Sequence, residues 1–87
     1  MRNCHRVGDL NDGGGEITDS LQESVFANGI LVAVTGSPVS GHGIHLPTKT
    51  GDGAPTVFAE GIPINRLDDV DECGHVRVDG SPDVFIE

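Results

Sequence analysis

The feature of this chain that most restricts its fold is a short repeat that carries all three of its phenylalanines. Residues 24–30, 56–62 and 83–87 each contain Val-Phe followed by one more apolar residue, and the first two copies continue into Asn-Gly or Glu-Gly. In those two copies a second run follows the glycine, at residues 30–34 and 62–67. Two such runs joined by a short turn with glycine are typical of a β-hairpin. The repeat therefore predicts two hairpins and the first strand of a third.

The missing strand of the third copy is found at the other end of the chain. Residues 4–9, Cys-His-Arg-Val-Gly-Asp, align with residues 64–69, Ile-Asn-Arg-Leu-Asp-Asp. We expect the N-terminal segment to pair with the C-terminal one, which would leave neither as an open sheet edge. Three such hairpins predict a compact all-β body with pseudo-threefold symmetry. The alternative is that Val-Phe before a turn recurs by chance, because the three Phe are unequally spaced, 32 and then 27 residues apart.

Size and composition agree with a small body of many turns. The chain has 87 residues, enough for a single domain over 1–87, with 13 Gly, 5 Pro and no Trp or Tyr. A chain of this size buries only about 60% of the surface that its unfolded form exposes, so its core is marginal. We therefore expect an additional source of stability.

The charge balance excludes several classes of function. Five Lys and Arg against 14 Asp and Glu give a net charge of −9, which repels nucleic acid and anionic membrane surfaces. No apolar stretch of 18 residues occurs, and the N-terminus lacks the apolar region of a signal peptide. Two cysteines in such a chain are expected to be reduced thiols.

A group of metal-ligand side chains lies in the loops that follow the predicted second strands. These loops are residues 10–15, 38–45 and 70–75, and a threefold arrangement places all three at one end of the body. There His42 and His45 of the second loop would meet Cys73 and His75 of the third. Three imidazoles and a thiolate suit a tetrahedral Zn²⁺ first and Fe²⁺ second. The predicted metal ligands are therefore His42, His45, Cys73 and His75, with Gly41, Gly43 and Gly74 allowing backbones to crowd there.

Each of these residues also has a plainer interpretation. His45 is otherwise an ordinary surface residue, and His75 the exposed first residue of a strand. Cys73 could form a disulfide with Cys4, and Asp12 is explained equally well as a solvated turn residue. His5, in the N-terminal strand, is the natural substitute if His45 or His75 does not bind.

The sequence resembles the PAAR-repeat family, whose members cap the spikes of type VI secretion systems and contractile phage tails. The resemblance covers nearly the whole chain. It lies in Arg-Val-Gly-Asp at residues 6–9 with Gly-Gly at 13–14, in residues 57–66, and in residues 73–86. The naming motif Pro-Ala-Ala-Arg is matched only at its ends, by Pro63 and Arg66.

The resemblance implies a small pointed β cone with a metal near its vertex, held by three His and one Cys. Cys73 fits the Cys-Gly of the family's last loop, and His42 fits the His-Gly of its middle loop. The family often has His before Gly-Gly in its first loop, where this chain has Asp12, so a substitute must come from His45, His75 or His5. The resemblance also implies that the broad base of the cone docks on a trimeric β-helical spike protein.

The expected function is a non-enzymatic, membrane-piercing spike tip, one copy per spike trimer, in transient contact with a target envelope. Because the chain stops at residue 87 without a toxin domain, we expect a plain tip, located in a virion tail or secreted by a type VI system. One rival is a small metallohydrolase in which His42, His45 and a carboxylate such as Asp71 hold zinc with an open position. Another is a metal-free interaction module closed by a disulfide between Cys4 and Cys73.

Overall fold

The computed structural model describes residues 2–87, and every regular element in that range is a β-strand of two residues. The strands are β1 (Arg2–Asn3), β2 (Phe26–Ala27), β3 (Ile30–Leu31), β4 (Pro38–Val39), β5 (Thr48–Lys49), β6 (Phe58–Ala59), β7 (Ile62–Pro63) and β8 (Phe85–Ile86). The described residues contain no helix with the length and hydropathy of a membrane span. The predicted all-β class with small hairpins is confirmed, in a body that measures 31 × 23 × 21 Å.

The two repeat hairpins form as predicted. Strand β2 pairs antiparallel with β3, and β6 pairs antiparallel with β7. Their turns place Asn28 and Gly29 at φ of 57° and 75°, and Glu60 and Gly61 at 51° and 81°. Two successive positive φ values define the turn that best matches the twist of a hairpin, and Asn-Gly is its preferred sequence. Glu60 adopts the same conformation, and its side chain is held in place by two hydrogen bonds. Its Oε2 accepts from the amide of Glu23 and from the hydroxyl of Ser24.

The two ends of the chain complete the third hairpin. Strand β1 pairs antiparallel with β8, with Arg2 opposite Ile86 and Asn3 opposite Phe85. The pairing continues into the body, where the amide of Cys4 donates to the carbonyl of Val84. The predicted closure of the chain by its first and last segments is therefore confirmed.

The segments after the three hairpins hydrogen-bond to one another in a closed cycle. The amide of His5 donates to the carbonyl of Asn65 at 3.0 Å, that of Asn65 to Ala33 at 2.9 Å, and that of Ala33 to His5 at 2.9 Å. His5 and Asn65, which the sequence aligns within residues 4–9 and 64–69, therefore take equivalent positions in this cycle. Pseudo-threefold symmetry of the whole body stays a prediction.

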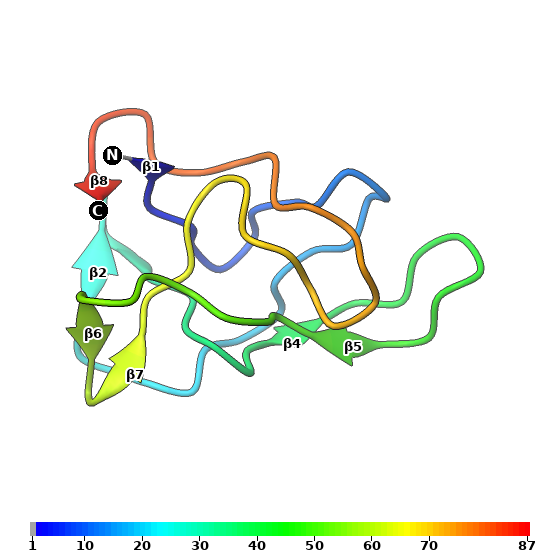
Figure 1. Ribbon diagram of the computed structural model, residues 1–87, viewed down its shortest axis with the longest axis horizontal. Coiled ribbons are helices and arrows are strands. Elements are labelled where there is room, and N and C mark those ends of the chain that lie inside the picture. Colours follow the sequence, from blue (N-terminus) through cyan, green and yellow to red (C-terminus); the bar gives the residue numbers. More distant parts are fainter. Residues whose placement is uncertain (1) are drawn as a thin grey trace.

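A fourth hairpin, β4 with β5, was not predicted. Pro38 lies opposite Lys49 and Val39 opposite Thr48, and residues 40–47 form a long arm between the two strands. In Figure 1 this arm is one end of the long axis, and β2, β6 and β8 lie at the other. No strand signal is visible here in the sequence, because Pro38 begins β4, Pro47 directly precedes β5, and the two residues of β5 are both polar. Residues 38–45, expected to be a loop, instead begin with a strand.

The core is built from small side chains. Its main cluster consists of Cys4, Ala27, Val32, Val34, Ala59 and Ile64, each at most 3% exposed. Burial raises the pKa of the Cys4 thiol to about 11, so Cys4 stays protonated and packs as a small apolar residue. Both cysteines are free in the described chain, so the alternative disulfide between Cys4 and Cys73 is not formed.

His5 is buried in a neutral form, which predicts an acid-sensitive fold. Its Nδ1–H donates to the carbonyl of Asp79 at 2.7 Å, and its Nε2 accepts from the guanidinium of Arg77 at 2.7 Å. Burial first, then the charge of Arg77, lowers the pKa of His5 from 6.5 to about 4, with Asp9 and Asp79 opposing the shift. The unfolded chain therefore binds this proton at a higher pH than the folded one.

We expect the free energy of unfolding to fall by roughly 3 kcal/mol as pH drops from about 6.5 to about 4. Urea unfolding of chelator-treated protein across this range measures the loss without a contribution from bound metal. The control is His5→Gln, which cannot take up the proton and should lose most of this pH dependence. Parallel pH profiles for the two proteins would contradict the assignment.

Candidate metal centre

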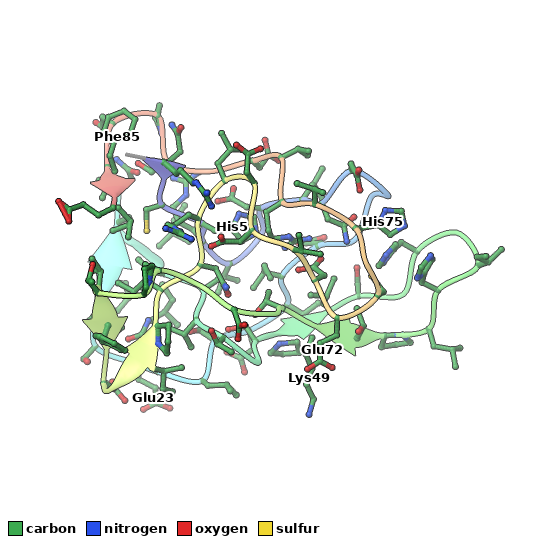
Figure 2. All side chains as sticks on the ribbon, viewed as in Figure 1. His5, Glu23, Lys49, Glu72, His75 and Phe85 are labelled. Carbon is green, nitrogen blue, oxygen red and sulfur yellow. The ribbon has the colours of Figure 1, made fainter. Side chains whose placement is uncertain are left out.

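Three turns converge at one end of the body. The other end is formed by the three outer hairpins, which are β1 with β8, β2 with β3, and β6 with β7 (Figure 1). The amide of Asn11 donates to the carbonyl of Gly15, and that of Asp71 to the carbonyl of His75, both at 2.8 Å. In the arm between β4 and β5, His42 and His45 exchange backbone hydrogen bonds of 3.0 and 2.8 Å across a two-residue turn. Figure 2 shows His75 at this end of the molecule, far from Phe85. The loops thus meet where the repeat placed them.

Three of the four predicted ligands present their donor atoms to one another. One ligand atom each from His42, His45 and Cys73 lies within 4.8 Å of the others. Cys73 Sγ lies 3.6 Å from His42 Nε2. The His42 ring is mostly buried, whereas His45 and Cys73 are half-buried. Two imidazole nitrogens and a thiol sulfur in this space form a candidate metal site.

The fourth predicted ligand, His75, lies beside this group. Its ring centroid is 4.6 Å from that of His45 and 5.0 Å from that of His42. Its Nδ1–H donates to the carboxylate of Asp12 at 2.7 Å, which leaves Nε2 free to bind a metal. The hydrogen bond from His75 lowers the pKa of the Asp12 carboxyl. Asp12, which the sequence explained as a solvated turn residue, thus orients a candidate ligand.

His42 is oriented in the same manner by a backbone carbonyl. Its Nδ1–H donates to the carbonyl of Ser40 at 2.7 Å, so Nε2, the atom that faces Cys73, carries the lone pair. A carboxylate or carbonyl behind each imidazole fixes its tautomer and is the usual arrangement around metal-binding histidines. The side-chain types and their hydrogen bonds therefore fit a tetrahedral ion held by nitrogen and sulfur.

Two glycines of the first turn make the space for the imidazoles. A Cβ atom on Gly13 would lie 2.6 Å from Nε2 of His75, and one on Gly15 would lie 2.5 Å from Nδ1 of His42. The glycines named from the sequence do not have this role. A Cβ on Gly43 or Gly74 would meet nothing within 4 Å, and on Gly41 only ordinary contacts from 3.4 Å. The Gly-Gly-Gly run was visible in the sequence, but only the packed turns show what its missing side chains accommodate.

Replacing Gly15 by Ala should weaken metal binding without breaking the backbone. The added methyl group must displace the His42 ring, and changes that misorient a ligand typically cost about 10- to 100-fold in metal affinity. Competition with a colorimetric zinc chelator measures this loss. Gly41→Ala, directly before His42 in sequence, is the matched control and should retain its affinity. Equal affinities for the two variants would show that Gly15 does not position the ring.

Two residues considered from sequence are not part of this cluster. Both ring nitrogens of His5 are engaged by Asp79 and Arg77 in the buried body, so His5 is not available as a substitute ligand. Asp71, the carboxylate of the hydrolase alternative, has a fully buried side chain paired with Arg77 at 2.9 Å. A groove of about 750 Å³ beside the β4–β5 hairpin includes Leu21, Val39 and Pro47 in its lining but none of the four candidate ligands. The geometry therefore gives the hydrolase alternative no support.

Comparison with known proteins identifies the family of the chain. None of the curated proteins matches the chain. The PAAR motif, in contrast, matches residues 7–79. This range takes in both outer hairpins formed within the chain, the three converging turns and all four candidate metal ligands. Because the match covers most of the 87 residues, the chain belongs to the PAAR motif family.

Proposed function

We propose that this protein is the non-enzymatic tip of a membrane-piercing spike, docked as one copy on the end of a trimeric β-helical spike protein. The PAAR motif family is associated with the spike-tip proteins of contractile injection systems. The tip serves a virion tail or a type VI secretion system, and meets the target envelope only transiently.

The observation that carries this proposal is the repetition of one exposed aromatic residue on three hairpins. Phe26, Phe58 and Phe85 are 56%, 53% and 48% exposed, and they lie on β2, β6 and β8. These strands form the end of the molecule opposite the metal centre (Figure 1). Exposed large apolar groups that recur in one region are typical of an interaction surface. We assign the docking base to these three side chains, and three equivalent positions suit a partner that is itself a trimer.

Side-chain hydrogen bonds between hairpins hold this base together. The amide nitrogen of Asn28, in the first turn, donates to Asp83 ahead of β8 at 2.7 Å. The carboxylate of Glu60, in the second turn, accepts from Ser24 ahead of β2 at 2.6 Å. Each of these turns is thus tied to the segment that enters another hairpin. A base held in this way presents its Phe side chains at fixed positions, which lowers the entropy cost of binding a partner.

The metal centre has a mechanical function in this proposal. Zn²⁺, or Fe²⁺ as the second choice, would be held by His42, His45, Cys73 and His75. Bound there, it would supply the cross-link that joins two of the three turns at the tip. Structural zinc contributes about 10 kcal/mol or more of apparent binding free energy in small domains. That contribution would supplement a core that is too small to give much stability by itself. X-ray absorption showing four protein ligands would support a structural ion, whereas a metal-bound water would support the hydrolase alternative.

Docking through the base predicts a specific loss of binding. Phe58→Asp should lower affinity for the cognate spike trimer at least tenfold, because a buried aromatic anchor typically contributes about 2 kcal/mol or more. Surface plasmon resonance measures this loss. Leu21→Asp, which alters a 55% exposed apolar residue outside the base, is the control and should bind normally. Native mass spectrometry should find one chain per trimer, and three chains per trimer would contradict the proposal.

A further inference from the structure

A buried carboxylate is connected to the candidate metal ligand His42 through one side chain. The side-chain nitrogen Nδ2 of Asn11 is 2.8 Å from Oδ2 of Asp71 and 3.4 Å from Nε2 of His42. Asn11 is 2% exposed, and the side chain of Asp71 is fully buried. A single amide nitrogen therefore separates a buried carboxylate from an atom that faces the candidate site.

The orientation of Asn11 is fixed by the backbone of the first turn. Its Oδ1 accepts hydrogen bonds from the amides of Gly13 at 2.9 Å and Gly15 at 2.7 Å. The side-chain NH₂ must therefore face Asp71 and His42. The two glycines are the same ones that make room for the imidazoles, so one turn positions both the ligand rings and the amide behind them.

Only one of the two carboxylate oxygens of Asp71 has a partner among the described residues. Oδ2 accepts a hydrogen bond from the side chain of Asn11 and forms an ion pair with the guanidinium of Arg77 at 2.9 Å. Oδ1 is buried and receives no hydrogen bond from the described residues. A buried carboxylate oxygen without a donor is rare in folded proteins and requires an explanation. A positive charge placed nearby, beyond that of Arg77, would supply one.

We propose that Asp71 is the outer counter-charge of the metal centre, and that it makes the site select a divalent over a monovalent ion. The proposal rests on the function proposed above only in taking His42, His45, Cys73 and His75 as ligands. Such a set, with one thiolate, binds Zn²⁺ well but also suits the softer Cu⁺. A fixed negative charge attracts an ion in proportion to the charge of that ion. Asp71 thus favours Zn²⁺ through one more unit of charge, whereas the ligand atoms alone favour softness.

The test is the ratio of Zn²⁺ to Cu⁺ affinity, measured anaerobically on the full chain by competition with chelators of known affinity for each ion. Because both ions bind the same folded state, any change in folding stability cancels in this ratio. Asp71→Asn keeps the size of the side chain and removes its charge. We expect its Zn²⁺ affinity to fall about 10- to 100-fold and its ratio to fall at least about threefold.

Asp69→Asn is the matched control. Asp69 is also buried and paired with an arginine, at 2.9 Å from Arg66, but it contacts none of the candidate ligands. Its ratio should equal that of the unaltered protein. If Asp71→Asn does not fold even with metal, Arg77→Gln is compared with Arg77→Gln combined with Asp71→Asn, because these two proteins differ only in the charge of Asp71, and the second should have the lower ratio.

If Asp71→Asn folds and its ratio of Zn²⁺ to Cu⁺ affinity falls by less than about threefold relative to the unaltered protein, the proposal is overturned. Absence of binding of either ion to the unaltered protein would instead reject the metal centre itself. The two failures are therefore distinguishable.

Discussion

Replacing Cys73 by Ser should remove the bound metal and most of the stability that it gives. The unaltered protein should contain about one zinc or iron per chain, and the variant close to none, because a hydroxyl is a far weaker ligand than a thiolate. An ion present at 1,000 times its dissociation constant stabilises the folded state by about 4 kcal/mol. Elemental analysis gives the metal content, and thermal unfolding with and without a chelator gives the stability.

The second cysteine supplies the control for this experiment. Cys4 belongs to the core cluster between the hairpins and is fully buried. Cys4→Ala should keep the metal, lose only a modest amount of packing energy, and remain sensitive to the chelator. Cys73→Ser should instead resemble the chelated protein before any chelator is added. Metal-free protein of full stability, with Cys73→Ser unfolding at the same temperature, would reject the site.

The hairpins could be predicted because their signals are local. Val-Phe, a turn with glycine and a second apolar run specify a hairpin by backbone preference alone. The closure of the termini, although distant in sequence, followed from the same repeat, since a first strand without a partner implied a partner elsewhere. The β4–β5 hairpin could not be predicted in this way. Its first strand, β4, is held by a residue distant in sequence, since Ile17 bridges to Val39 and packs with it in the core.

The candidate site divides in the same manner. The ligand types and the convergence of their loops followed from the repeat, so His42, His45, Cys73 and His75 were named from the sequence. The residues around them were not. Gly15 matters for the methyl group that it lacks, and Asn11 for an amide oriented by two backbone N–H groups. Such roles depend on which turn packs against which ring, and no spacing in the sequence encodes that.

Arg77 was given no role in the sequence analysis, yet it is the largest fully buried side chain among residues 2–87. Its guanidinium lies 2.9 Å from Asp71, donates to Nε2 of His5 at 2.7 Å and to the carbonyl of Gly15 at 3.1 Å. It therefore joins the N-terminal segment, the first turn and the third turn through one buried charge. A positive charge within an apolar body is tolerated only where its partners are as well placed as these.

Arg77→Met should consequently destabilise the metal-free protein by about 3–5 kcal/mol, because it leaves Asp71 buried without its counter-charge. Urea unfolding in the presence of chelator measures the loss. Arg66→Met removes an arginine paired with Asp69 and should cost less, because Asp69 keeps a second partner in Arg2 at 3.0 Å. Adding Asp71→Leu to Arg77→Met should recover much of the stability, since a buried pair replaced by apolar residues of similar size is often neutral. If Arg77→Met lost no more stability than Arg66→Met, the buried pair would not be what holds the three segments together.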